Sequence, residues 1–192
     1  MTHIYSFWED SYITSQPTII KNIIPDQGII MEKNLFYPTS GGQPSDSGQI
    51  KFDNQIASIL EARKTKNEDI LLVLESFPDD LQIGMKGVQE INWELRYRHM
   101  RMHTALHLLS VVIPLPVNGG QIGEMKSRLD FNMPDPIEDK QKIEDEINDL
   151  IQQDLNVEQL WIAEIELDKN PKLVKTMSVS PPRGSGDIRL IR

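Results

Sequence analysis

Short apolar runs separated by turn residues fill the part of the chain between residues 18 and 91. Turn signals such as Pro25-Asp26-Gln27-Gly28 and Asp53-Asn54 divide these runs, because proline, glycine and short polar side chains favour the backbone angles of turns. Several short strands at this spacing are typical of a small antiparallel barrel or sandwich. The predicted strands are Thr18–Ile24, Gly28–Met31, Leu35–Tyr37, Gln49–Phe52, Ile56–Ala62 and Ile70–Leu74.

The pattern changes near Asn92, where apolar residues begin to recur at helical spacing. The segment Trp93–Ile113 contains neither glycine nor proline and ends directly before Pro114, which predicts one long helix. A second helix is expected after Asp135, a candidate N-cap that is followed by Pro136 and by Glu138 at the spacing of a capping box. Its apolar stripe is Ile143, Ile147, Leu150, Ile151 and Leu155.

The remaining segments of the second half predict strands and turns. Residues 114–136 are interpreted as loop and strand, with a turn at Asn118-Gly119-Gly120. The segment Trp161–Leu167 alternates as a strand, and Asp187–Arg192 is a strand candidate that follows a turn at residues 181–186. The change of pattern divides the chain near residue 90 into a β-rich part and a part that also contains helices.

The length and charge of the chain limit its class. It has 192 residues, with 29 acids against 20 lysines and arginines, and its formal net charge is −9. This length allows one domain or two small ones. The acidic balance argues against a protein that coats duplex nucleic acid by bulk charge, although it leaves room for a local basic site.

Three features that the sequence lacks limit the class of protein further. It has no apolar run of about 18 residues, so no membrane span is expected. The N-terminal residues show no secretory signal, so we expect a cytoplasmic protein. The chain as given has no cysteine, which excludes disulfides and thiolate-bound metals within it.

The charges are unevenly distributed along the sequence. Acids dominate residues 135–155, whereas residues 93–128 are basic. Charged helix faces are usually only solvated, but these cations flank two histidines in an otherwise acidic chain. We call them the basic cluster and predict that they form a rim that contacts phosphates; they are Arg96, Arg98, Arg101, Lys126 and Arg128.

The clearest chemical feature is the pair His103 and His107. The two residues are four apart on the predicted helix, so both imidazoles project from one face and can reach one metal ion. Zinc accepts neutral imidazole as a ligand, although a coincidental spacing of two histidines is the alternative. His99 lies about 12 Å from His107 along the helix axis, too far for one ion, and is expected on the surface.

The loop from Thr39 to Gln43 is the second feature. Its residues Ser40, Gly41 and Gly42 let backbone N–H groups approach a ligand closely, while Thr39 and Gln43 supply side-chain donors and acceptors. A tight turn without a ligand is the alternative interpretation of such a string.

Together these segments carry a resemblance to a known family. The segment Phe36–Gly48 resembles the signature loop of alanyl-tRNA synthetase editing domains and their free-standing AlaX relatives, and Arg101–Leu109 resembles the zinc helix of that family. The segment Ser127–Phe131 is similar to the strand that follows this helix, and Pro181–Arg192 resembles a late family segment. The four matches occur in the family's order and cover roughly residues 28–192.

The resemblance implies a fold and an activity. The family has an α+β fold: a small antiparallel β-barrel-like N-terminal domain, expected here over residues 1–90, and an α+β two-layer editing domain, expected over residues 91–192 and shared with threonyl-tRNA synthetases. Its members are aminoacyl-tRNA deacylases that hydrolyse the ester of serine or glycine wrongly attached to alanine tRNA. A chain this short has no adenylate-forming domain, so it would edit in trans.

The resemblance also implies roles for individual residues. His103 and His107 would bind zinc, and Thr39 and Gln43 would act on the aminoacyl group as catalytic residues. Substrate contacts are expected from Thr39, Ser40, Gly41, Gly42 and Gln43 in the loop, and from Arg101 and Arg128 on phosphates. The expected partner is the acceptor end of alanine tRNA, with neither DNA nor a membrane.

The sequence departs from the family pattern in two places. Ser40 stands where the family usually has glycine. The family completes its zinc site with a Cys-Gly-Gly-Thr-His stretch shortly after the segment that this chain ends with, so weak or absent zinc is expected here. Two alternatives therefore remain: a tRNA-binding or protein-interaction module without catalysis, and a metal hydrolase that acts on another ester.

Overall fold

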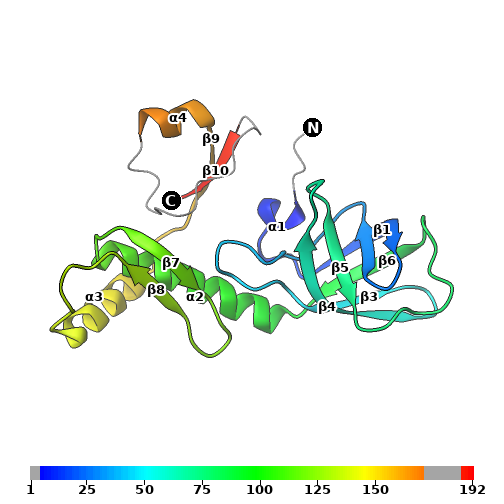
Figure 1. Ribbon diagram of the computed structural model, residues 1–192, viewed down its shortest axis with the longest axis horizontal. Coiled ribbons are helices and arrows are strands. Elements are labelled where there is room, and N and C mark those ends of the chain that lie inside the picture. Colours follow the sequence, from blue (N-terminus) through cyan, green and yellow to red (C-terminus); the bar gives the residue numbers. More distant parts are fainter. Residues whose placement is uncertain (1–4, 171–186) are drawn as a thin grey trace. The chain divides into compact units, whose positions relative to one another are not determined.

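The computed structural model describes residues 5–170 and 187–192. The chain divides into two compact units, Met1–Met100 and Arg101–Arg192. The division falls inside the long helix α2 (Trp93–Val112), so this helix contributes residues to both units (Figure 1). The domain limits expected from the sequence, 1–90 and 91–192, stay a prediction.

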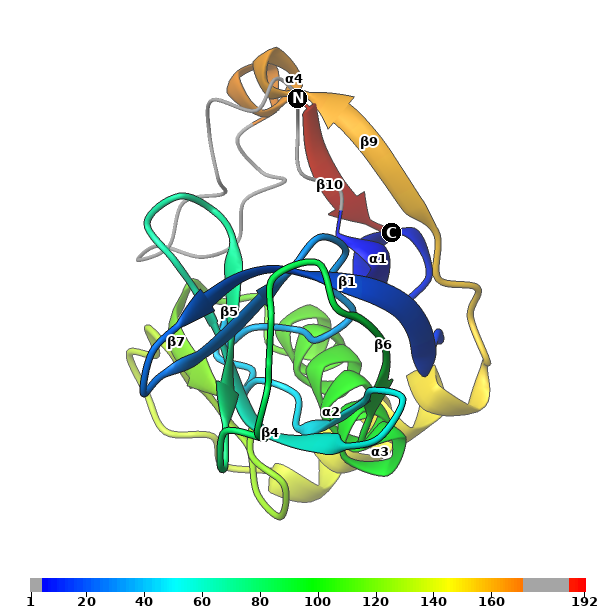
Figure 2. The same ribbon diagram turned by 90° about the vertical axis from the view of Figure 1, so that its right-hand side faces the viewer.

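The first unit contains a closed antiparallel β-barrel (Figure 2). Its strands follow the order β1-β2-β5-β4-β3-β6, and β1 closes the barrel by pairing with both β2 and β6. The predicted α+β class with a small antiparallel barrel is thus confirmed. The strands are β1 (Ser15–Ile24), β2 (Gly28–Met31), β3 (Gly48–Lys51), β4 (Ile56–Lys64), β5 (Ile70–Leu74) and β6 (Lys86–Ile91).

The alternation of side chains along the strands builds the barrel core. In β4, for example, Ala57 and Ile59 are buried while Ile56 and Leu60 are exposed, as the two-residue period of a strand requires. Gly28 lets β2 approach β5 closely, because a Cβ atom there would lie 1.9 Å from the carbonyl oxygen of Leu72. The largest of the fully buried apolar side chains are Ile20, Ile29, Leu35, Phe36, Ile50, Ile59 and Leu72.

The segment Leu35–Tyr37 is not a strand, which corrects the prediction, although Leu35 and Phe36 are buried and the half-buried Tyr37 packs against the core. Its backbone N–H groups bind side chains in place of a neighbouring strand: Leu35 donates to Gln89 Oε1 at 3.2 Å and Tyr37 donates to Asp46 Oδ2 at 2.7 Å. The apolar pattern identified core residues correctly. It could not show that polar side chains from distant positions satisfy this backbone.

Two elements of the first unit were not predicted. The short helix α1 (Ser6–Glu9) buries Phe7 in the core. Strand β6 has few apolar residues, and one of them, Val88, is exposed, so its sequence shows little of the usual alternation. Its place between β1 and β3 is what makes it a strand.

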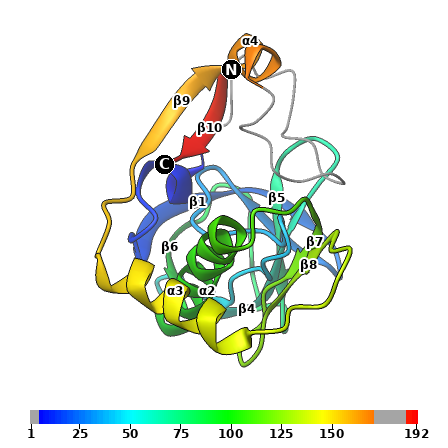
Figure 3. The same ribbon diagram turned by 90° about the vertical axis from the view of Figure 1, so that its left-hand side faces the viewer.

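The second unit combines helices with two small two-stranded sheets (Figure 3). The predicted long helix is confirmed as α2. Strand β7 (Val117–Gln121) pairs with β8 (Arg128–Phe131), and β9 (Gln159–Ala163) pairs with β10 (Asp187–Ile191), both antiparallel. The other helices are α3 (Lys140–Gln152) and α4 (Glu164–Lys169).

Three predictions for the second unit need correction. Asn118-Gly119-Gly120 lies inside β7 and is not a turn, because β8 supplies its pairing partners. Helix α3 begins at Lys140, and its N-cap is Asp139, whose Oδ1 accepts from the backbone N–H of Lys142 at 2.9 Å, so Asp135 is not its N-cap. The strand expected over Trp161–Leu167 ends at Ala163, where α4 begins.

Along the described residues, no helix combines the length and the apolar composition that crossing a lipid bilayer requires.

Candidate functional site

The loop from Thr39 to Gln43 is a tight two-residue turn. The backbone N–H of Ser40 donates to the carbonyl of Gln43 at 3.1 Å, and the N–H of Gln43 donates back to the carbonyl of Ser40 at 2.9 Å. The two central residues, Gly41 and Gly42, have φ values of 57° and 77°. Both lie in the left-handed region that favours glycine, so the turn depends on this pair of glycines.

Further hydrogen bonds hold the loop in place. The backbone N–H of Thr39 donates to the carbonyl of Ala62 in β4 at 3.2 Å, and Tyr37 donates its hydroxyl to the carbonyl of Ser40 at 3.2 Å. The hydroxyl oxygen of Thr39 accepts from the backbone N–H of Ser45 at 3.2 Å. This oxygen is therefore fixed in position, while the hydroxyl hydrogen can still be donated to a ligand.

The two candidate loop side chains differ in their access to solvent. Thr39 is exposed together with Ser40, Gly41 and Gly42, whereas Gln43 is buried. An incoming ligand can therefore reach Thr39 and the two glycines directly. Their predicted contact with an aminoacyl group stays a prediction.

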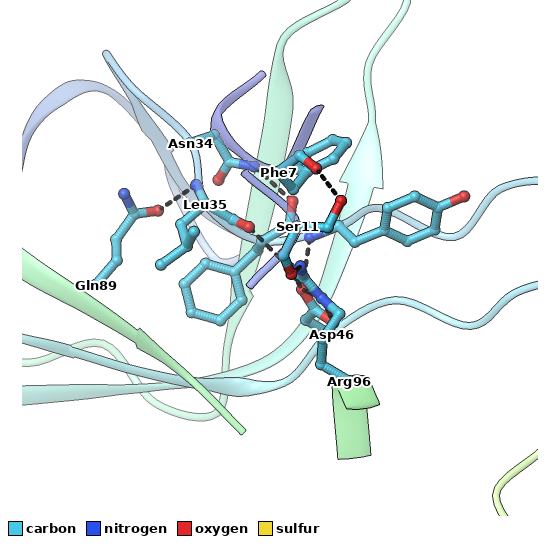
Figure 4. Close-up of polar contacts among 9 residues, drawn as sticks. Phe7, Ser11, Asn34, Leu35, Asp46, Gln89 and Arg96 are labelled. Atoms are coloured by element: carbon cyan, nitrogen blue, oxygen red, sulfur yellow. Dashed lines mark hydrogen bonds and ion pairs between the residues drawn. The ribbon is translucent and has the colours of Figure 1, made fainter. Parts of the chain in front are cut away.

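A buried ion pair links this loop to the first turn of α2 (Figure 4). Arg96 and Asp46 are only 2% and 1% exposed in their side chains. Arg96 Nε lies 2.7 Å from Asp46 Oδ1, and Arg96 Nη2 donates both to Asp46 Oδ2 and, at 2.9 Å, to the carbonyl of Leu35. Asp46 also accepts from the backbone N–H of Tyr37. Each charge is therefore compensated by several hydrogen bonds inside the barrel unit.

This pair corrects the prediction for Arg96. As a member of the basic cluster it was expected on a solvated rim that contacts phosphates, but its guanidinium is enclosed by the fold. Sequence reasoning also missed Asp46 as its partner. The only signal was a lone acid inside the signature loop, fifty residues before the arginine in the sequence.

The other members of the basic cluster are exposed. Arg98 Nη2 lies 2.6 Å from Glu94 Oε1 one turn earlier on α2, and Arg128 Nε lies 3.4 Å from Asp130 Oδ2. Exposed ion pairs of this kind are weak, so both arginines can exchange their carboxylates for phosphates at little cost. Arg101 and Lys126 complete the cluster, and its role as one rim stays a prediction.

The two candidate zinc ligands lie side by side on α2. The ring centroids of His103 and His107 are 5.0 Å apart, and the ring planes differ by only 13°. Burial, the neighbouring His107 and Arg189 together lower the pKa of His103 to about 4. His103 is therefore a neutral imidazole near pH 7, the form that offers a lone pair to a metal.

The donor set of this pair fits half of a zinc shell. Structural zinc sites have four protein ligands and catalytic sites have three. Over residues 5–170 and 187–192, no group of three or more His, Cys, Asp or Glu side chains lies close enough together to hold a metal ion. The two histidines are thus compatible with zinc as two of its ligands, and zinc binding stays a prediction.

His99 is buried at 3% exposure, so its predicted surface position is wrong. It lies three residues after Arg96 on α2, and residues at this spacing share a helix face. That face is the buried one in this part of the helix. The exclusion of His99 as a third ligand to the same ion rests on the helix rise and is unaffected.

The structure does not test several predictions made from the sequence. The roles implied for the loop Thr39–Gln43 and for His103 and His107 predict that both face one cleft. The loop belongs to the first unit and the histidines belong to the second, so this cleft stays a prediction. The turn expected at residues 181–186 lies outside the described residues. Two pockets on the barrel, of about 430 and 190 Å³, are lined by neither the loop nor the histidines.

Comparisons with known proteins give relatives for almost the whole chain. An alanyl-tRNA editing protein AlaX-M from Methanosarcina barkeri is 32% identical over 184 residues, which cover 90% of this chain and 74% of that protein. An AlaX-M protein from Methanosarcina acetivorans is 34% identical over 142 residues, covering 69% of this chain and 58% of that protein. No family model matches the chain.

A longer protein shows the same similarity in one part of its length. The alanine–tRNA ligase of Pyrobaculum calidifontis is 31% identical over 160 residues, which cover 79% of this chain but 17% of the ligase. The similarity to M. barkeri AlaX-M extends over most of both chains, so it is the one that assigns the family. The chain belongs to the AlaX family of alanyl-tRNA editing proteins.

Proposed function

We propose that this protein is an aminoacyl-tRNA deacylase that edits alanine tRNA in trans, by hydrolysing the ester of a wrongly attached serine or glycine. A synthetase pocket built for alanine cannot strongly reject glycine or serine, so a second hydrolytic site is needed. The observation that carries the proposal is a parallel imidazole pair, with His103 held neutral, in a chain of the AlaX family. The exposed loop with a fixed threonine hydroxyl supports it.

Each group in this proposal has one role. Zinc bound at His103 and His107 would supply a Lewis acid that polarises the ester carbonyl. Thr39 donates its hydroxyl hydrogen to the hydroxyl of a seryl group, and the backbone N–H groups of Gly41 and Gly42 give a close approach to the aminoacyl end. Gln43 orients this turn from its buried position. Arg101 and Arg128 hold phosphates of the acceptor end, and such contacts position the tRNA without reading its bases.

A deacylation assay tests this function. Alanine tRNA charged with serine, glycine or alanine is incubated with the protein, and the released amino acid is measured. The seryl and glycyl esters should be hydrolysed faster than the alanyl ester. The double variant His103→Ala/His107→Ala should lose this activity, while Thr104→Ala, an exposed position between the histidines on α2, should keep it. Equal activity of both variants would contradict the role of the pair.

Zinc content is a separate measurement. Two imidazoles leave half of a tetrahedral shell to water, so this chain should bind zinc weakly and below one ion per chain. Appending a segment that carries the family's Cys and His ligands should give tight binding. Elemental analysis that finds one tightly held zinc in the chain without such a segment would contradict this proposal.

A non-catalytic module that binds tRNA or a protein is the second candidate. The observation that favours it is that the described residues offer two metal-binding side chains close together and not three. An inactive wild-type protein that still binds alanine tRNA would support this candidate. Hydrolysis of simple esters without preference for mischarged tRNA would instead indicate a metal hydrolase with another substrate.

A further inference from the structure

Three aromatic rings come together on the surface of the first unit. We call Tyr12, Trp93 and Tyr97 the aromatic platform. The rings of Trp93 and Tyr97 stack with centroids 5.4 Å apart and an interplanar angle of 27°, and the ring of Tyr12 lies 5.6 Å from that of Trp93 and 6.5 Å from that of Tyr97. None of the roles assigned above uses these residues.

The platform is exposed although its rings are apolar. Tyr12 is 64% exposed and Tyr97 is 40% exposed. A second ring group of the same unit shows the usual behaviour, because its members Tyr5 and Phe7 are buried in the barrel core. A contiguous group of exposed apolar rings is typical of an interaction site, whereas single exposed apolar residues need no explanation.

Contacts with the rest of the unit support the platform. Trp93 is half-buried and packs against the barrel core, so it holds the other two rings in place. The backbone N–H of Tyr12 donates to Asp10 Oδ1 at 2.8 Å, which fixes the turn that carries this ring. Tyrosine and tryptophan rings also lose little conformational entropy on binding, because each has only two side-chain torsions.

Positive charge stands next to the rings. Trp93, Tyr97 and Arg101 follow one another at intervals of four residues on α2, so they form one stripe on the helix, and Arg101 is exposed. Arg98, adjacent to Tyr97, is exposed as well and pairs with the exposed Glu94, a weak surface ion pair that a phosphate can replace. Aromatic rings on which bases stack, combined with cations that follow the backbone, are the chemistry by which proteins bind single-stranded nucleic acid. The chain as a whole has a net charge of −9, which makes this local combination distinctive.

We propose that the aromatic platform stacks unpaired bases at the 3′ end of the tRNA acceptor arm. This inference rests on the proposed function, which makes a tRNA with an aminoacylated 3′ end the substrate. Two of its rings, Trp93 and Tyr97, belong to the first turns of the helix that later carries His103 and His107. Stacking tolerates any base, so the platform holds the unpaired end without reading its sequence.

Binding to two RNA hairpins tests the proposal. One hairpin is the acceptor stem of alanine tRNA with its unpaired 3′ nucleotides, and the other is the same stem without them. Tyr12→Ala/Tyr97→Ala should weaken binding of the first hairpin by about tenfold or more, as expected for the loss of base stacking. It should leave binding of the second hairpin unchanged.

Two controls separate stacking from other effects. Tyr12→Phe/Tyr97→Phe keeps the rings and should bind as the wild type does, while Phe77→Ala removes an exposed ring elsewhere on the unit and should also have no effect. Thermal melting of each variant confirms that it is folded. An unchanged affinity of the alanine double variant for both hairpins overturns the proposal and would leave the face to a protein partner.

Failure of the platform proposal can be distinguished from failure of the proposed deacylase function. If the wild type hydrolyses mischarged tRNA and the alanine double variant hydrolyses it with the same kcat/KM, the platform proposal fails while the deacylase stands. If the wild type hydrolyses nothing but the double variant loses affinity for the unpaired end, the deacylase fails and the platform proposal is supported.

Discussion

The two ends of α2 use polar side chains in opposite ways. Near its start, Arg96 is enclosed in the barrel unit and shares several hydrogen bonds with Asp46. Further along, His103 and His107 stack on a helix face that is partly open to solvent, and His103 is kept uncharged. The first arrangement buries an ion pair inside the fold, while the second places two imidazoles side by side, with one of them neutral. A basic or metal-binding residue is therefore a functional candidate only if the fold leaves it accessible.

The largest expected effect comes from breaking the buried pair. Arg96→Ala leaves the Asp46 carboxylate buried without its partner, which should lower the free energy of unfolding by about 3–5 kcal/mol. Urea denaturation measures this loss. Arg98→Ala removes an exposed arginine two residues later and should change stability by less than about 0.5 kcal/mol. An equal decrease in the free energy of unfolding in the two variants would show that the buried ion pair contributes no more to stability than an exposed arginine.

A smaller effect is expected at the loop that the buried pair supports. Thr39→Val preserves the shape of the side chain and removes the hydroxyl. If this hydroxyl contacts a seryl group, hydrolysis of seryl-tRNA should fall by a factor that corresponds to about 1–3 kcal/mol, while hydrolysis of glycyl-tRNA should change little. The rates on the two substrates decide the point. A similar decrease on both would mean that Thr39 supports the loop through its bond to Ser45 and does not contact the side chain.

The exposed cations should show a milder, salt-dependent effect. Because Arg96 is enclosed, only the remaining members of the basic cluster can contact phosphate. With two or three such contacts, the log–log slope of tRNA affinity against salt should be about −2, at roughly 0.7–0.9 per phosphate. Arg101→Glu and Arg128→Glu should each weaken binding and reduce this slope without unfolding the protein. An unchanged slope in both variants would make the cluster only a solvated face.

The smallest expected effect is on the titration of His103. Its pKa of about 4 lies below the ordinary value of 6.5, so the unfolded chain binds the proton more readily than the folded one between these pH values. Its contribution to stability is therefore complete above pH 6.5 and is lost as the pH falls towards 4. Burial, His107 and Arg189 lower this pKa, in decreasing order of effect. Arg189→Gln removes the smallest of these three effects and should raise the pKa of His103 slightly. NMR titration in the presence of a chelator measures it, and a pKa that stays the same or falls would contradict the assignment.

The sequence by itself determined the local elements and the family. Strands β2 and β5 and the start of α2 coincide with the predicted residues, because the periods of two and 3.6 residues depend only on neighbours along the chain. The shared face of His103 and His107 follows from the same helical geometry. The four ordered motifs already resembled the AlaX family, and the similarity to AlaX-M proteins confirmed it.

Tertiary structure alone decided which polar residues are enclosed. Arg96 and His99 are both buried, but the sequence alone could not distinguish them from exposed residues. The burial of Arg96, for example, depends on an aspartate fifty residues away. Leu35–Tyr37 likewise became core without becoming a strand, since Gln89 and Asp46 supply its hydrogen bonds. The burial of a side chain and its hydrogen-bond partners depend on residues that are far apart in the sequence and meet only in the folded protein. A local pattern of residues does not show which of these residues come into contact.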